Sequence, residues 1–200
     1  PRISAKLGTR VRTNSESILG STERSEQTDY SQGVCITSIF HADPVTSIEP
    51  VRYPAGSDLM RFLSSPLVST GELFSRILQS LWIILTHPLD FARTHLIPGW
   101  ARRTTIILVM QTEDNLLHMR QGRSLFTLFQ RNLVSRPDQE KPIPKTIQIG
   151  HEVTRRFASL TKGIPSGSLF ESMLNIPITA HILGGAPFGE DAESGVIDLD

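Results

Sequence analysis

The sequence predicts an α+β fold, in which strands and helices form separate groups along the chain. Two β-branched, apolar runs near residue 40 are separated by a proline-containing turn. An apolar stripe with helical spacing follows, and a second group of apolar runs begins at Thr104. The resulting order is a strand pair, helices, a strand meander and a further helix.

The first strand pair is expected at residues 33–40 and 46–53, with Asp43 and Pro44 in the turn between them. Residues 1–30 are polar and rich in Ser, Thr, Glu and Arg. That composition predicts loop with short helix, because these side chains bond readily to the local backbone.

A short helix is expected at 58–63 and a long one from Leu73, followed by a stop or a second helix at Pro88. The apolar residues of the long helix recur at spacings of three and four, typical of one helical face. They are Leu73, Phe74, Ile77, Leu78, Leu81, Ile84 and Leu85. Charged residues interrupt the apolar region 73–100, whereas a membrane span needs about 20 mostly apolar residues in a row. We expect a core-facing helix pair, with a surface helix that touches a bilayer as the alternative.

The second group of strands is expected at 104–111, 116–120 and 124–130, followed by a proline-rich loop at 136–145. Residues 113–115 are expected to form a turn. A helix should span 147–161, with three apolar residues facing inward, and the rest of the chain should be loop-rich with short elements. The three are Val153, Phe157 and Leu160.

Composition excludes several classes of protein. The chain has 200 residues, with 20 basic and 20 acidic side chains. Because basic residues are not in excess, the composition does not indicate a surface that binds nucleic acid. A hydrophobic content of 38% is ordinary for a globular protein. The single cysteine, Cys35, excludes an internal disulfide and a multi-cysteine metal site. The start Pro1-Arg2-Ile3 has no signal pattern, and both ends, including 196–200, indicate a fragment.

Common nucleotide and metal motifs are absent. The sequence contains no G-x-G-x-x-G and no Walker A motif, so it holds no complete phosphate-binding loop. The stretch His151-Glu152-Val153-Thr154-Arg155 begins like a zincin helix, but Arg155 replaces the second histidine. We therefore predict no metal site.

The stretch 179–185, Thr-Ala-His-Ile-Leu-Gly-Gly, places His181 three residues before a glycine pair. Two glycines let a backbone approach a flat ligand where a Cβ would collide. A histidine beside such a gap can exchange a proton with a ligand. The alternative is a buried structural histidine next to a tight turn.

Four blocks of the chain, in this order, resemble the glucose-methanol-choline (GMC) flavoprotein oxidoreductases, in their cholesterol oxidase-like branch. The blocks are 13–16, 48–56, 108–115 and 179–185, the last followed by Gly189 and by Gly195-Val196-Ile197-Asp198. The sequence departs from the family at Ala186, where relatives often have cysteine. The resemblance covers nearly the whole chain.

The resemblance implies a two-domain enzyme that binds FAD and oxidises an alcohol by passing hydride to the flavin. Residues 1–178 would form most of the substrate domain, a mostly antiparallel sheet with helices on one side. Residues 179–200 would begin the C-terminal segment that contacts the flavin. The family's phosphate loop and terminal segment are missing, so the resemblance implies a piece that is inactive alone.

By the same resemblance, His181 would be the active-site histidine and Glu49 the carboxylate base. Asn14, Gly184 and Gly185 would lie at the flavin. The substrate would be a sterol or another apolar alcohol, and the region 73–100 could touch a membrane transiently. No obligate protein partner is expected, and the location would be cytoplasmic or peripheral to a membrane.

Two alternatives to these assignments stay open at this point. Glu49 could be a strand carboxylate in a surface salt bridge with Arg52 or Arg61. The whole chain could be a non-catalytic module of the same fold that binds an apolar ligand or a partner.

Overall fold

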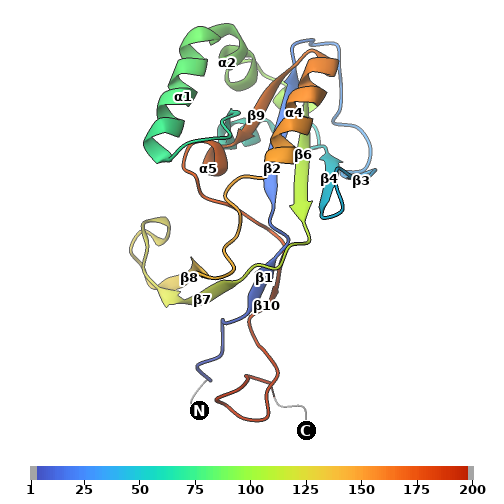
Figure 1. Ribbon diagram of the computed structural model, residues 1–200. Coiled ribbons are helices and arrows are strands. Elements are labelled where there is room, and N and C mark those ends of the chain that lie inside the picture. Colours follow the sequence, from blue (N-terminus) through green and yellow to red (C-terminus); the bar gives the residue numbers. More distant parts are fainter. Residues whose placement is uncertain (1–3, 198–200) are drawn as a thin grey trace. The chain divides into compact units, whose positions relative to one another are not determined.

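The computed structural model describes residues 4–197, so Asp198 and the end of the stretch 196–200 lie outside the described residues. The chain forms two compact units (Figure 1). The small unit comprises Pro1–Ser15, Thr112–Ile143 and Thr179–Asp200. The large unit comprises Glu16–Gln111 and Pro144–Ile178. The functional division expected at residue 178 stays a prediction.

The large unit is built on a six-stranded sheet with the order β3-β4-β6-β2-β9-β5. All five neighbouring pairs are antiparallel. The strands are β2 (Ser17–Glu23), β3 (Phe40–His41), β4 (Thr46–Val51), β5 (Ser64–Pro66), β6 (Thr104–Gln111) and β9 (Gly163–Ser168). The α+β fold with antiparallel pairing is therefore confirmed.

Three longer helices of the large unit are α1 (Leu73–Thr86), α2 (Pro88–His95) and α4 (Gln148–Thr161), and its shorter ones are η1 (Asp58–Leu63), α3 (Trp100–Arg103) and α5 (Leu169–Ser172). The helix α4 packs on β2 and β9. A Cβ at Gly150 would come within 2.7 Å of Val109, so glycine permits this close approach. The core lies between α4 and the sheet and comprises Leu19, Ile48, Ile107, Val109 and Ile147.

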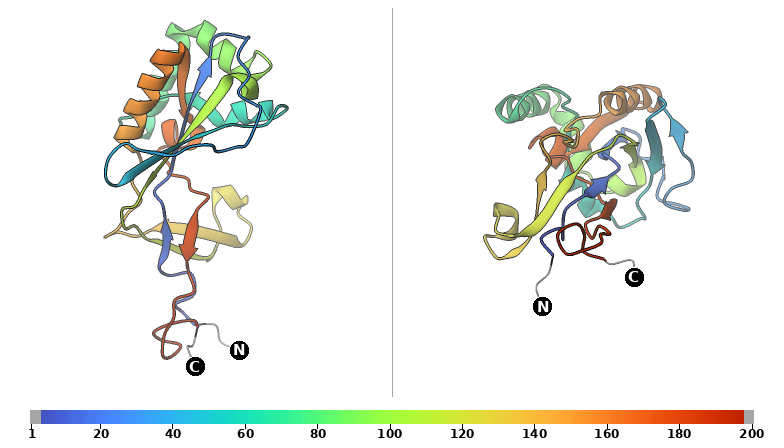
Figure 2. Two further views of the ribbon diagram at one scale, coloured as in Figure 1. Left: turned by 90° about the vertical axis from the view of Figure 1, so that its right-hand side faces the viewer. Right: turned by 60° about the horizontal axis from the view of Figure 1, so that its bottom comes forward.

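The small unit contains a four-stranded antiparallel sheet with the order β10-β1-β7-β8. Its strands are β1 (Val11–Thr13), β7 (Leu117–Gly122), β8 (Asn132–Pro137) and β10 (Ile182–Gly184), and η2 (Leu125–Thr127) lies between β7 and β8. Figure 2 shows β1 and β10 side by side, although 168 residues separate the end of β1 from the start of β10. This pairing brings the first and last described segments of the chain together.

Several expectations about elements were wrong. The polar segment 1–30 contains β1 and β2, and β2 lies inside the sheet. Of the strand expected at 33–40, only Phe40 belongs to β3. The expected strand 124–130 is η2 and a turn, because Leu128 and Phe129 adopt the left-handed backbone conformation. The next strand, β8, begins at Asn132 and occupies the start of the expected loop.

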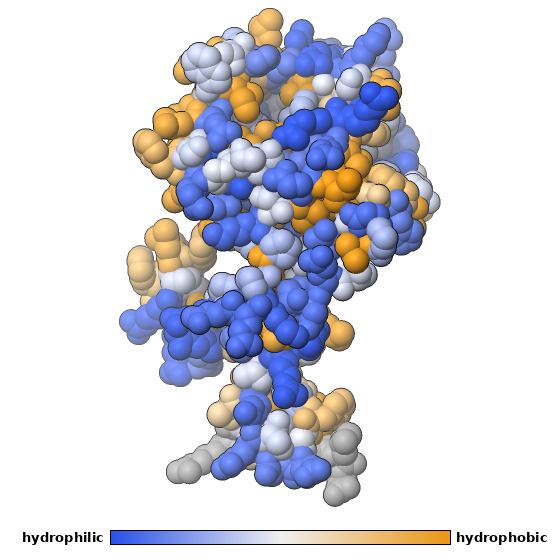
Figure 3. Space-filling model, viewed as in Figure 1, coloured by the Kyte–Doolittle hydropathy of each residue, from blue (hydrophilic) through white to orange (hydrophobic). Residues whose placement is uncertain are grey.

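The long helix α1 has its polar side inward, which contradicts the expected core-facing stripe. Arg76 and Ser80 are buried, whereas five of the seven stripe residues are exposed. The exposed ones are Leu73, Phe74, Leu78, Leu81 and Leu85. Leu160 of α4 is also exposed, against expectation. Apolar side chains therefore gather along the edge formed by α1 (Figure 3).

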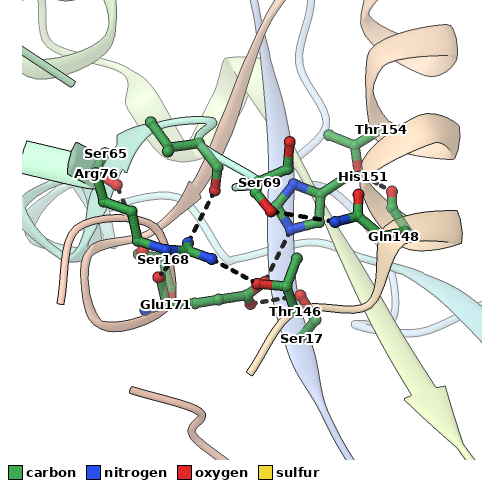
Figure 4. Close-up of polar contacts among 12 residues, drawn as sticks. Ser17, Ser65, Ser69, Arg76, Thr146, Gln148, His151, Thr154, Ser168 and Glu171 are labelled. Atoms are coloured by element: carbon green, nitrogen blue, oxygen red, sulfur yellow. Dashed lines mark hydrogen bonds and ion pairs between the residues drawn. The ribbon is translucent and has the colours of Figure 1, made fainter. Parts of the chain in front are cut away.

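The inward side of α1 contributes to a buried polar network (Figure 4). The Glu171 carboxylate accepts hydrogen bonds from Ser17 Oγ at 2.5 Å and from His151 Nε2 at 2.9 Å. The Arg76 guanidinium donates to the Glu171 carbonyl oxygen at 3.1 Å and to Thr146 Oγ1 at 2.9 Å. The network ties α1, α4, α5 and β2 together, so His151 has a structural role.

Among the described residues, no helix has the length and apolar character needed to cross a membrane. The same residues contain no cluster of three or more His, Cys, Asp or Glu side chains suited to a metal ion.

Candidate active site

His181 lies on the small unit just before β10, and its imidazole is held by Asn14. The Asn14 side-chain nitrogen lies 3.1 Å from His181 Nδ1. The other end of the same amide accepts a hydrogen bond from Thr179 Oγ1 at 3.3 Å. Thr179 Oγ1 also accepts from the His181 backbone N–H at 3.2 Å. His181 is exposed, so the alternative of a buried structural histidine is wrong.

This contact defines the protonation pattern of a neutral His181. With the Asn14 –NH₂ group facing the ring, the amide donates, and Nδ1 accepts and carries no proton. The proton of the neutral imidazole then lies on Nε2. His181 can therefore offer an N–H donor to an oxygen of a bound ligand, while Asn14 fixes the orientation of the ring.

Gly184 and Gly185 were expected to give the backbone room beside a ligand, and the structure shows a second reason for glycine at these positions. Gly184 and Gly185 have φ values of +92° and +90°, a region that favours glycine. A Cβ on Gly184 would come within 2.5 Å of the Arg10 carbonyl oxygen. Glycine at 184 is thus required by the pairing of β10 with β1. The Gly184 backbone is nevertheless exposed, so it can also contact a ligand.

Glu49 lies in the large unit, on β4. It pairs with Leu108, and Leu108 pairs with Ile18, so these three side chains share one face of the sheet. The neighbouring core residues Ile48 and Val109 point to the opposite face, which α4 covers. Glu49 is half-buried and lies among apolar neighbours.

The salt bridge considered for Glu49 does not form among residues 4–197. The Arg52 guanidinium donates to the Gln32 carbonyl oxygen at 2.6 Å. The Arg61 guanidinium lies 5.1 Å from the centre of the Phe62 ring. Neither cation pairs with the Glu49 carboxylate, which is left available to a ligand.

The face of the sheet that carries Glu49 and Ile18 also borders a small apolar hollow of about 90 Å³. It is lined by Ile18, Tyr53, Met60, Trp100, Ile106 and Phe170, among others. Small-molecule pockets usually have about 300–1,000 Å³, so this hollow can take only part of a ligand. A second hollow of about 290 Å³ lies between α1, α2, α4 and the strands β5 and β9.

The structure thus brings four of the five expected site residues into one unit. Asn14 and His181 are in contact, and Gly184 and Gly185 follow on the same strand and loop. Glu49 belongs to the other unit. Within the small unit, His181 and the exposed Gly184 backbone provide a hydrogen-bond donor and an accessible stretch of main chain. In the large unit, Glu49 provides a carboxylate without a cationic partner among the described residues.

Comparison with known proteins shows that the chain is similar to cholesterol oxidases. The chain is 38% identical over 198 residues to a cholesterol oxidase of Acinetobacter baumannii, a match that covers 99% of this chain and 35% of the relative. It is 39% identical over 204 residues to a cholesterol oxidase of Mycobacterium tuberculosis, with the same coverage. The chain therefore spans about a third of the length of these curated relatives. No family model and no solved structure matches it.

Proposed function

We propose that this chain is the substrate-binding part of an FAD-dependent oxidoreductase of the GMC family that oxidises the hydroxyl group of a sterol. Similarity to cholesterol oxidases over nearly the whole chain supports the proposal. The observation that carries it is the exposed His181 imidazole held through Nδ1 by Asn14, because this arrangement presents an N–H donor to a substrate oxygen.

The roles of the two proposed catalytic residues follow from the chemistry of alcohol oxidation. A hydroxyl proton and a carbon-bound hydride must both leave while the C=O bond forms. His181 binds the substrate oxygen through Nε2–H and stabilises the negative charge that develops there. Glu49 accepts the hydroxyl proton, and a positioned acid–base group of this kind contributes about 10²–10⁴ in rate.

FAD, when bound, supplies the hydride acceptor that no amino-acid side chain can provide. The described residues fit contact with its ring system, since the Gly184 backbone is exposed beside His181 and Asn14. The sequence has no glycine-rich phosphate loop, so we assign the phosphate contacts to other parts of a complete protein. This chain alone would then have no activity.

The exposed apolar side of α1 supports the proposed contact with a membrane. Trp82 is 68% exposed and Leu85 is 75% exposed, on a helix whose polar residues Arg76 and Ser80 point inward. Such a helix can lie in the membrane interface with its apolar side in the lipid. We propose that this surface docks transiently on the bilayer from which a sterol is taken.

The variant His181→Gln in the complete protein tests the proposed function. We expect turnover of a sterol to fall about 10²-fold or more while the bound flavin is retained, because only the donor to the reacting oxygen is altered. Turnover and flavin absorbance would be measured on the same preparations. Unchanged turnover would contradict the assignment of His181.

A further inference from the structure

Asn115 lies in the loop between β6 and β7, where the sequence predicts a turn, yet its side chain is buried. Only 1% of its surface is exposed. A residue at the tip of a turn would be solvated, and burial of an amide costs free energy unless its hydrogen bonds are satisfied. The side chain therefore needs hydrogen-bond partners, and these belong to residues about 100 positions earlier in the chain.

The Asn115 amide is bonded at both ends to the segment that contains Asn14. Its Oδ1 accepts from the Thr13 backbone N–H and from Thr13 Oγ1, each at 3.0 Å. Its Nδ2 donates to the Thr13 carbonyl oxygen at 2.9 Å and to Ser15 Oγ at 2.8 Å. Both neighbours of Asn14 are thus attached to one buried side chain.

The backbone at Ser15 shows that this attachment imposes a particular geometry. Ser15 is fully buried and has a φ of +46°, a conformation that side-chain-bearing residues adopt uncommonly. The segment leaves the extended conformation of β1 at this point, directly after Asn14. The hydrogen bonds from Asn115 compensate for this conformation and fix the direction of the intervening residue.

The preceding loop residue strengthens the same attachment. The Asp114 carboxylate accepts from Arg12 Nε at 2.8 Å and also pairs with Lys141. The hydrogen bonds from these two cations hold the pKa of Asp114 below its usual value. Loop residues 114 and 115 therefore hold Arg12, Thr13 and Ser15 through side-chain hydrogen bonds.

We propose that Asn115 is a positioning residue, which fixes Asn14 against His181 and so sets the tautomer that the imidazole presents to a substrate. The proposal rests on the proposed function for its catalytic meaning. The coupling of Asn115, Asn14 and His181 is a property of this unit and can be measured without any turnover.

The test is nitrogen-15 NMR of the imidazoles in the complete protein, labelled selectively at histidine. The His181 signals are identified by their loss in His181→Gln. In the unaltered protein we expect the neutral form of the ring to carry its proton on Nε2. In Asn115→Asp, which keeps the acceptor oxygen but loses the bonds donated to Thr13, Ser15 and Glu113, we expect a mixture of the two tautomers.

Two further variants keep this test decisive. Thr13→Val removes only the hydroxyl and should produce a smaller shift in the same direction. Asp138→Asn removes the ion pair with His118, 2.8 Å long, in the same sheet and should leave the His181 signals in place. If Asn115→Asp leaves the His181 tautomer unchanged in a folded protein, the positioning role is wrong. An equal change in Asp138→Asn would also contradict it, because the effect would then be a general loosening of the sheet.

Kinetics separates this inference from the function on which it rests. For Asn115→Asp we expect kcat to fall about 10²-fold with little change in KM, because orientation is lost and substrate contacts are kept. A tautomer change in a protein that turns over no sterol would support the positioning role and contradict the proposed function. A loss confined to KM, with an unchanged tautomer, would contradict the positioning role alone.

Discussion

At the scale of single residues, Asn14 and Glu49 differ in how they are held. The Asn14 amide is engaged at both ends, by His181 and by Thr179. The Glu49 carboxylate is half-buried and has no cationic partner among the described residues. The Glu49 carboxylate therefore differs from a carboxylate in a salt bridge, whose charge is already compensated by a cation.

The variant Glu49→Gln tests the proposed base. Because an amide cannot accept the hydroxyl proton, we expect kcat for sterol oxidation to fall about 10²-fold or more, while folding is preserved by the similar shape. The matched control is Ser47→Ala, since Ser47 lies on the same strand and faces the same side. Equal kinetics in Glu49→Gln and the unaltered protein would contradict the proposed role.

Some of these residue-level features could be predicted from the sequence, and others could not. The glycine pair could be recognised because positive φ angles strongly favour glycine, and both residues have them. The contact of Asn14 with His181 joins residues 167 positions apart, which no local pattern encodes. Asn115 was expected in a turn because asparagine is common there, and only its burial shows the other role.

At the scale of elements, the network around Glu171 determines how three helices pack on the sheet. Its carboxylate is nearly inaccessible to solvent and is bonded to Ser17 and His151. Removal of one member of such a group leaves the others buried without partners, which is costly.

For Glu171→Ala we expect a loss of about 3 kcal/mol or more in the free energy of unfolding. Urea unfolding followed by circular dichroism would measure it. Glu152→Ala, on the exposed side of α4, is the control and should change stability by less than about 0.5 kcal/mol. Similar effects of the two substitutions would show that the network does not stabilise the large unit.

A second element-scale prediction concerns pH. Arg24 binds the Asp90 carboxylate of α2 and the carbonyl oxygens of Lys162 and Gly163, where α4 ends. The hydrogen bond from Arg24 lowers the pKa of Asp90 from its ordinary value of 3.8. Because the folded-state pKa is the lower one, this stabilisation is present above pH 3.8 and is lost as the pH falls through the folded-state value.

The variant Asp90→Asn should therefore be less stable than the unaltered protein at pH 6 by about 1 kcal/mol. The difference should shrink steadily below the ordinary pKa of 3.8. Unfolding free energies measured across this range provide the test. A difference that stays constant down to the most acidic conditions would mean that Asp90 contributes through its shape and not through its charge.

Local pattern predicted some elements well and missed others for physical reasons. The apolar run 104–111 became β6 with the expected bounds. Its residues are buried on the α4 side, as at Ile107 and Val109, and half-buried on the other side, so both sides favour apolar side chains. The polar strand β2 was missed because buried Ser17, Ser21 and Thr22 interrupt its apolar pattern. The stripe of α1 was recognised as helical, but periodicity does not reveal which side of a helix faces the core.

At the scale of the whole molecule, the exposed apolar side of α1 predicts binding to lipid vesicles. We expect the complete protein to sediment with vesicles of phosphatidylcholine and cholesterol. The double variant Leu78→Gln and Leu85→Gln should bind at least about tenfold more weakly, because each buried leucine contributes roughly 1.5–3 kcal/mol.

The control for vesicle binding is Leu160→Gln, which alters a leucine on α4 whose exposure lies between those of Leu78 and Leu85. It should leave vesicle binding unchanged. Absence of binding in the unaltered protein would contradict the proposed membrane contact, as would equal weakening by the control.

The match covers only part of the length of each relative. The chain covers 35% of each relative while nearly all of this chain is matched. The proposed reaction needs a hydride acceptor, and these 200 residues contain no complete phosphate-binding loop for a dinucleotide. The central claim, sterol oxidation by hydride transfer, is therefore tested on the complete protein.

The most direct measurement of that claim is the absorbance spectrum of the complete protein mixed with a sterol in the absence of oxygen. The account predicts a flavin spectrum that is bleached when sterol is added, and much more slowly bleached in His181→Gln. A protein without bound flavin, or a flavin whose spectrum does not change with any sterol, would contradict it.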